Sequence, residues 1–156
     1  MSTSGLIRTI TDSFSRPADT TQYTGGDLVA NSTTAGSVVP LTFNVGRGGI
    51  RVKGAFITKT DETDLTAADF SLHLFGSSPT VANGDNGTLS YNYAAKFADI
   101  DFATMVAATD VAWAFSQGLD LNYYTTGNIY GLIEADGTYT PASAEVFSVT
   151  LAFERT

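Results

Sequence analysis

The stretch Asp69-Phe70-Ser71-Leu72-His73-Leu74-Phe75-Gly76-Ser77-Ser78-Pro79 decides the fold class. Apolar and polar side chains alternate along it, and this period of two is typical of a half-buried β-strand. One side of the predicted strand carries Phe70, Leu72 and Leu74, and the other carries Ser71 and His73. A second β-like run, from 50 to 59, precedes it, with a possible bulge at Gly54, after which both faces become apolar.

The same alternation recurs toward both ends of the chain. It is clearest in the last run, from 147 to 154, and it is present from 39 to 45 and from 111 to 116. In the run from 111 to 116 the larger side chains, Trp113 among them, are expected to face the core. Together with shorter runs these segments predict roughly eight strands without a repeat, so the fold class is all-β: a β-sandwich or jelly roll.

Three connecting segments have their own predictions. Two Asn-Gly pairs between 81 and 87 indicate an exposed loop, because this dipeptide suits positive backbone dihedrals. The segment 103–108 could form a short helical turn, and 122–127 reads as a loop that leads into a central strand at 129–133.

Length and charge limit the possible partners. A chain of 156 residues suits one domain. Sixteen acidic and eight basic residues give a net charge of -8, and the basic residues are spread from Arg8 to Arg155 without forming a patch. This charge opposes binding to nucleic acid or to an anionic membrane, so neither is expected as a partner. No signal peptide and no membrane-spanning run is recognised in the sequence.

The N-terminal segment is the least determined part. Leu6, Ile10 and Phe14 are spaced four apart, but the threonines and serines between them are weak helix formers, so helix, strand and extended arm all stay open. The expected division is an N-terminal arm at 1–17, which could be ordered only on assembly, and a β-sandwich domain at 18–156.

Catalytic and metal-binding patterns were sought among the polar residues. His73 is the single histidine, so it cannot form a paired-histidine zinc site, and no nucleophile-elbow pattern accompanies it. Asp99 and Asp101 would share one face of a strand, yet no calcium-loop pattern surrounds them. Cysteine is absent, which excludes disulfides and thiolate metal sites. We therefore expect a protein that is not an enzyme, with no catalytic residues, metal or cofactor.

Several phrases resemble a known family. They are Pro40-Leu41-Thr42-Phe43, Ile50-Arg51-Val52-Lys53-Gly54-Ala55, the stretch 69–79 and Ile100-Asp101-Phe102, preceded by Asn31-Ser32-Thr33-Thr34. In this order they resemble the head decoration, or cement, proteins of tailed bacteriophages, through most of the chain from about Tyr23. The resemblance implies a virion structural protein, made in the host cytoplasm, that binds the major capsid protein on the outer capsid surface, commonly as a homotrimer.

The contact residues are a separate hypothesis. Apolar side chains of the arm could become ordered on a neighbouring protein, and a pair of tyrosines beside the predicted turn could serve as interface anchors. The candidate capsid or subunit contacts are Leu6, Ile7, Arg8, Ile10, Phe14, Tyr123 and Tyr124. Alternatively the arm only completes the protein's own sheet or trimer. The competing function is a carbohydrate-binding β-sandwich of a virion or tail, with a glycan held by Tyr123, Tyr124 and acidic loop residues.

Overall fold

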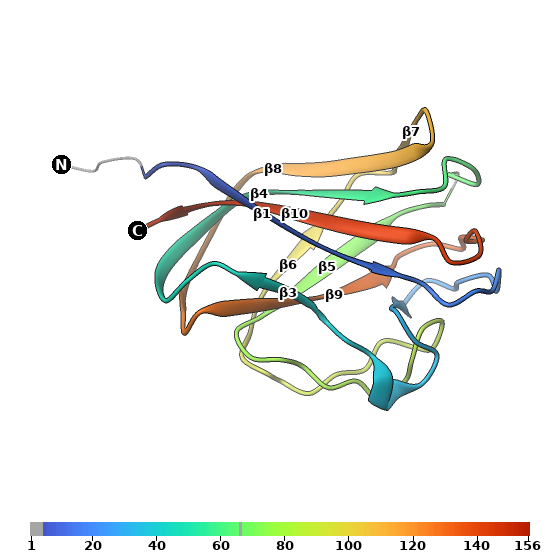
Figure 1. Cartoon of the computed structure of the whole chain (residues 1–156), viewed down its shortest axis with the longest axis horizontal. Helices are drawn as coiled ribbons and strands as arrows, with labels where there is room; N and C mark the ends of the chain where they lie inside the picture. The colour runs from blue at the N-terminus through green and yellow to red at the C-terminus, as the bar shows by residue number, and fades with distance from the viewer. Residues whose placement is uncertain (1–4, 66) are drawn as a thin grey trace.

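The computed structural model describes residues 5–65 and 67–156 and is an all-β sandwich, as predicted (Figure 1). Two antiparallel sheets face each other, with the first in the order β1-β10-β4-β8-β7 and the second in the order β2-β9-β5-β6, where β3 also pairs with β9. The strands are β1 (Arg8–Ser15), β2 (Asp27–Val29), β3 (Leu41–Asn44), β4 (Gly48–Lys59), β5 (Phe70–Phe75), β6 (Lys96–Asp101), β7 (Val106–Ala108), β8 (Val111–Thr125), β9 (Asn128–Ala135) and β10 (Val146–Arg155).

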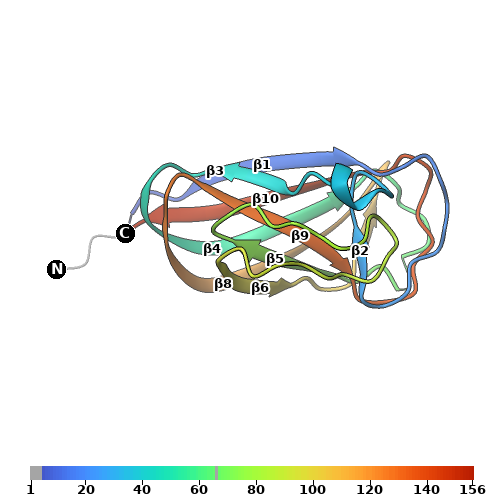
Figure 2. The same cartoon turned by 90° about the horizontal axis from the view of Figure 1, so that it is seen from below.

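The core lies between the two sheets (Figure 2). Alternate residues of β10 and β5 fill it: Phe147, Val149, Leu151, Phe70 and Leu72 are each at most 1% exposed. At about 25 cal/mol per Å² of apolar surface, such burial is the main source of stability. The described residues contain no helix that is long and apolar enough to cross a bilayer.

The N-terminal segment forms a strand, which is one of the three conformations that the sequence left open. Residues 8–15 pair along their whole length with β10, from Arg8 opposite Phe153 to Ser15 opposite Val146. Ile10 and Phe14 point inward and pack against the core. This part of the expected arm therefore belongs to the sandwich, while residues 1–4 lie outside the described residues.

Two connecting segments differ from the prediction. Val106–Ala108 is strand β7 rather than a helical turn, and β8 continues to Thr125, so that Tyr123 and Tyr124 are strand residues and not loop residues. Strands β1 and β7 bring the described strands to ten, against the roughly eight predicted. The expected irregularity near Gly54 is confirmed, because the pairing of β4 with β8 shifts between Val52 and Gly54.

The loop between 81 and 87 is also less exposed than its sequence suggests. Asn86 has the positive φ of 66° expected in an Asn-Gly pair, but Asp85 beside it is only 5% exposed. The Asp85 carboxylate accepts the backbone N–H of Ala30 at 2.8 Å, which ties this loop to the end of β2. No local sequence pattern predicts that Asp85 is buried. Its buried contact with Ala30 gives the loop a structural role.

Candidate functional site

At one end of the sandwich the start of β1 lies beside the end of β10 (Figure 1). The side chains of Leu6, Ile7 and Tyr124 are 78%, 51% and 66% exposed. Tyr124 lies opposite Gly49 in the sheet, and Thr156 donates its N–H to the carbonyl of Gly49 at 3.2 Å. Four candidate residues from distant parts of the sequence, Arg8 included, are thus brought to one end, which we call the termini surface.

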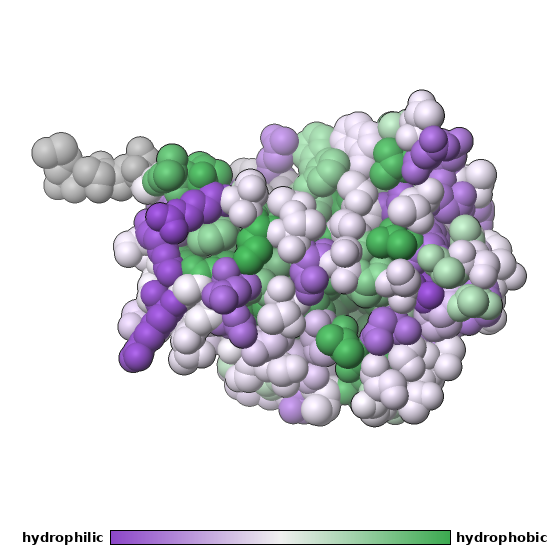
Figure 3. All heavy atoms as spheres, viewed as in Figure 1, coloured by the Kyte–Doolittle hydropathy of each residue, from purple (hydrophilic) through white to green (hydrophobic). Residues whose placement is uncertain are grey.

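Arginine and lysine side chains surround these apolar groups. The termini surface includes five of the eight basic residues: Arg8, Arg47, Arg51, Lys53 and Arg155. Only some of them are neutralised, since Arg51 and Lys53 pair with Asp120 and Arg51 also with Glu154. Figure 3 shows apolar and strongly hydrophilic side chains side by side here. The fold thus brings basic residues that are far apart in the sequence to one end of the sandwich, where Asp120 and Glu154 also lie.

The other three candidate residues are turned inward. Ile10 and Phe14 pack on the core, and Phe14 stacks on Phe147 with ring centroids 5.9 Å apart. Tyr123 packs on Phe97 of the second sheet, at 4.1 Å and an interplanar angle of 12°. Neighbouring strand residues point to opposite faces, so Tyr123 and Tyr124 do not form one platform. Whether any of the seven residues contacts a capsid stays a prediction.

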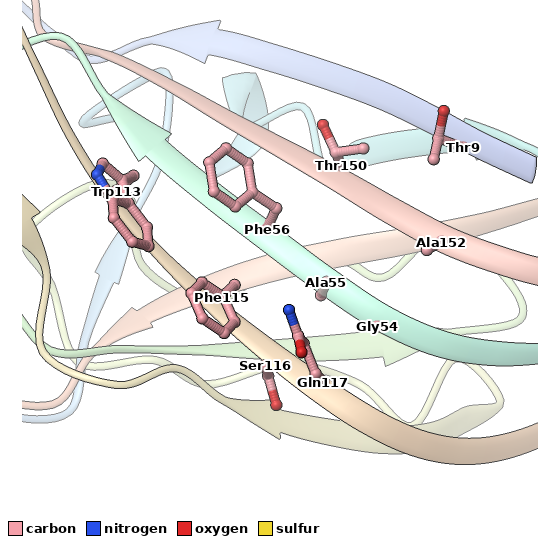
Figure 4. A pocket seen from close by; sticks show the side chains of 10 residues that line it. All are labelled: Thr9, Gly54, Ala55, Phe56, Trp113, Phe115, Ser116, Gln117, Thr150 and Ala152. Carbon is pink, nitrogen blue, oxygen red and sulfur yellow. The ribbon is translucent and has the colours of Figure 1, made fainter.

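A second surface is the outward face of the first sheet, where Figure 4 shows three aromatic side chains from β4 and β8. Trp113 and Phe115 are stacked, 5.5 Å apart and at 7°, and Phe56 lies 6.1 Å from Trp113. Phe115 is 43% and Phe56 39% exposed. The prediction that Trp113 faces the core is wrong: Ala112 and Ala114, at 0% and 2% exposure, occupy the inward positions.

Thirteen outward-facing residues of this sheet, paired with one another across its strands, are all uncharged. They form three rows across the sheet: Val106, Trp113, Thr58, Ser148 and Ser13; then Phe115, Phe56, Thr150 and Thr11; then Gln117, Gly54, Ala152 and Thr9. A hollow of about 490 Å³ opens over the last two rows. We call this region the neutral face. It contrasts with a chain that has 24 charged residues.

The outward face of the second sheet is acidic and holds His73. Its Nδ1 lies 2.7 Å from Asp99 and its Nε2 lies 3.1 Å from Glu134. The ring therefore bridges β6, β5 and β9. Its position opposite the apolar face of β5 and its polar surroundings are as predicted.

Carboxylates also gather around Ser71, whose hydroxyl contacts Asp101 at 2.8 Å and Asp136 at 2.5 Å. Desolvation raises the pKa of Asp136, and the charges of Glu134 and Asp101 raise it further, against a hydrogen bond from Ser71. Among the described residues no group of carboxylates and histidine has the arrangement of a metal site. Together with the contacts of His73, these groups make this face a network of ionic and hydrogen-bonded side chains.

At the end remote from the termini, ionic groups are buried. Arg16 and Asp85 form a salt bridge of 2.9 Å with both side chains fully covered, and the Tyr23 hydroxyl donates to Asp85 at 2.6 Å. Arg16 Nε in turn donates to the Tyr23 oxygen. These contacts connect the segments that follow β1 and precede β6. Sequence reasoning missed them, since the two partners are 69 positions apart.

A second buried pair lies close by. Lys59 and Glu145, both fully covered, are 2.9 Å apart, and Tyr139 donates its hydroxyl to the same carboxylate. Burial, followed by the charge of Glu145, raises the pKa of Tyr139, which keeps this hydroxyl a donor. The rings of Tyr139 and Tyr23 stack at 5.8 Å and so join the two pairs into one network. Its groups are paired with one another, which suits a structural role.

No family model matches the chain, and no curated protein sequence is similar to it. Among solved structures it is similar to a capsid structure of the Helicobacter pylori bacteriophage KHP30, at 10% identity and a TM-score of 0.35, covering 96% of this chain and 93% of that one. It is also similar to the K1 adhesin domain of Lys-gingipain from Porphyromonas gingivalis, at 10% identity and a TM-score of 0.32, covering 96% and 99%. A third is a virus-like particle of the extra small virus of the prawn Macrobrachium rosenbergii, at 8% identity and a TM-score of 0.29, covering 94% and 80%.

Proposed function

We propose that the protein is a structural protein of a phage virion, which binds the outer surface of the capsid and stabilises it without catalysing a reaction. The observation that carries the proposal is the termini surface, where exposed Leu6, Ile7 and Tyr124 lie among arginines. The phrases that resemble head decoration proteins support it independently. In this proposal the major capsid protein is the partner and the protein acts as a homotrimer on the capsid.

The chemistry of the termini surface suits a protein partner. Burying one leucine- or isoleucine-sized side chain contributes roughly 1.5–3 kcal/mol, so Leu6 and Ile7 together could supply a large part of a micromolar affinity. Arg8 and Arg47 are exposed, form no salt bridge within the described chain, and can bind carboxylates of the shell. Arginine and tyrosine are also the residues enriched in the energetic centres of interfaces.

Co-sedimentation with empty capsids of the phage that carries the gene tests the proposal. The wild-type protein should pellet with capsids and saturate at a fixed number of copies. The double variant Leu6→Ser, Ile7→Ser should lose binding by at least about tenfold. Val39→Ser is the matched control, because Val39 is 65% exposed but lies before β3 and outside the termini surface. Absence of co-sedimentation by the wild type would refute the proposed function.

Salt provides a second measurement on the same complex. Arginine contacts to carboxylates are screened beyond about 10 Å at 0.1 M salt and more closely at higher concentrations. Binding through the termini surface should therefore weaken as salt is raised from 0.1 to about 1 M. Capsid binding that strengthens with salt would contradict a contribution of the arginines to the contact.

A further inference from the structure

We propose that the hollow in the neutral face binds a pyranose ring of an uncharged glycan. This site is distinct from the termini surface, and it does not depend on the proposed function. The candidate tyrosines considered from the sequence do not take part in it. Its elements are an aromatic wall, a floor of small residues and a rim of hydroxyl and amide groups.

The aromatic wall consists of side chains from adjacent strands. Phe115 and Phe56 are opposite each other in the β4–β8 ladder, and Trp113 stacks on Phe115. All three remain partly exposed at a surface where apolar side chains normally would be covered. The axial hydrogens on one face of a pyranose form an apolar surface that packs on such rings.

The floor explains why there is a hollow at this position. Gly54 and Ala152 are paired across β4 and β10, and next to them the registers of both β4 ladders shift. A Cβ at Gly54 would come within 3.2 Å of the carbonyl oxygen of Ser116. Small residues beside a bulge thus leave space next to Phe56, and Figure 4 shows the side chains around it.

The rim supplies the polar groups that a sugar requires. Thr9, Thr150 and Gln117 border the hollow. The hydroxyl of Thr150 already exchanges a hydrogen bond with Thr11 at 2.7 Å, which fixes its position. A purely apolar protein segment would leave the Thr9 hydroxyl and the Gln117 amide without partners, at a cost of about 1–3 kcal/mol for each that became buried. Sugar hydroxyls would satisfy them.

The absence of charge specifies the ligand further. An acidic glycan would be repelled by a chain of net charge -8, the three rows contain no cation, and Lys53 beside Gly54 is paired with Asp120. A basic ligand would find no carboxylate among the outward positions of the three rows. An uncharged hexose or N-acetylhexosamine unit matches both the rings and the rim.

Trp113 makes the experiment simple, because it is the only tryptophan and lies in the aromatic cluster. The full-length protein is titrated with maltohexaose, cellohexaose, mannohexaose and chitohexaose while tryptophan emission is recorded. At least one of these probes should give a saturable change. Ala152→Leu, which fills the hollow and retains Trp113, should abolish it, and Phe115→Ala should weaken binding by about tenfold.

The controls keep the result interpretable. Tyr93→Ala removes another exposed aromatic side chain, 78% exposed, in the loop before β6, and should bind as the wild type does. Thermal unfolding verifies that each variant folds. No saturable change with any probe, supported by a silent array of neutral glycans, overturns the proposal. So does a change that persists in Ala152→Leu, or a wild type that dimerises through this face and is made monomeric by Phe115→Ala.

Discussion

Replacing Lys59 by methionine should reveal how strongly the buried ion pair contributes to the fold. The Lys59 side chain is fully covered, its Nζ lies 2.9 Å from Glu145, and it donates to the carbonyl of Asp61 at 2.6 Å. The ammonium also lies 4.8 Å from the ring centroid of Tyr139. Methionine fills a similar volume but removes the cation, so the covered Glu145 carboxylate would keep only neutral donors.

The magnitude follows from that uncompensated charge. Breaking a buried pair by removing one partner costs about 3–5 kcal/mol. For a chain of this length each kcal/mol lowers the melting temperature by roughly 2–4 °C, so a decrease of about 6–20 °C is expected. Urea unfolding at pH 7 measures the free energy directly, and an unchanged m-value would show that the same surface is exposed.

Two further variants make this prediction refutable. Adding Glu145→Gln to Lys59→Met removes the stranded charge and should restore part of the lost stability. Lys53→Met is the matched control, because its pair with Asp120 is 3.9 Å long and exposed, and it should change stability by less than about 1 kcal/mol. A Lys59→Met loss as small as that of Lys53→Met, or a double variant less stable than the single one, would contradict the reasoning.

Four other substitutions test three separate features. Gly46→Ala should destabilise by at least about 1 kcal/mol in urea unfolding, because φ is +77° and a Cβ would lie 2.5 Å from the Arg155 guanidinium. Asp136→Asn should raise the melting temperature at pH 7 but not at pH 3. The fold raises the pKa of Asp136, so the folded state binds this proton more tightly than the unfolded state does. The stability that this provides at low pH is lost as the pH rises above about 4, and the asparagine is neutral at both pH values. Ala114→Leu should cost about 1–3 kcal/mol by overpacking while Phe115→Leu is nearly neutral, and the reverse order would place the aromatic residues of β8 inside.

The sequence was sufficient to predict which face is buried in strands whose two faces differ in polarity. In β5 the apolar side carries Phe70 and Leu72 against Ser71 and His73, and only one orientation buries the hydrophobic side chains. In β8 both faces carry apolar side chains, and the assumption that the larger ones face the core was wrong. Ala114 faces inward opposite Ile57 of β4, whose larger side chain fills the core, so the aromatic side chain of Trp113 is left outside.

The candidate surfaces are harder to predict because they are made by pairing between distant strands. Arg155 lies opposite Ile50, and Gly49 lies opposite Tyr124, so the termini surface combines segments that no local pattern connects. The partners of the Lys59–Glu145 pair are separated by five strands along the chain. Periodicity reports which residues share a face of one strand, whereas these arrangements require the order of the strands in the sheet.

The positions of the two proposed surfaces lead to one joint consequence. The termini surface closes one end of the sandwich, and the neutral face runs along its side, so attachment by the end leaves the hollow beside Phe56 accessible. A capsid carrying many copies would then present many glycan sites, and avidity would exceed the affinity of a single copy by a factor of about 10² or more. Decorated capsids should therefore be retained on an immobilised glycan that binds the free protein only weakly, and capsids decorated with Ala152→Leu should pass through. Retention of both would assign the glycan to another virion component, and loss of glycan binding upon decoration would place the neutral face, rather than the termini surface, against the shell.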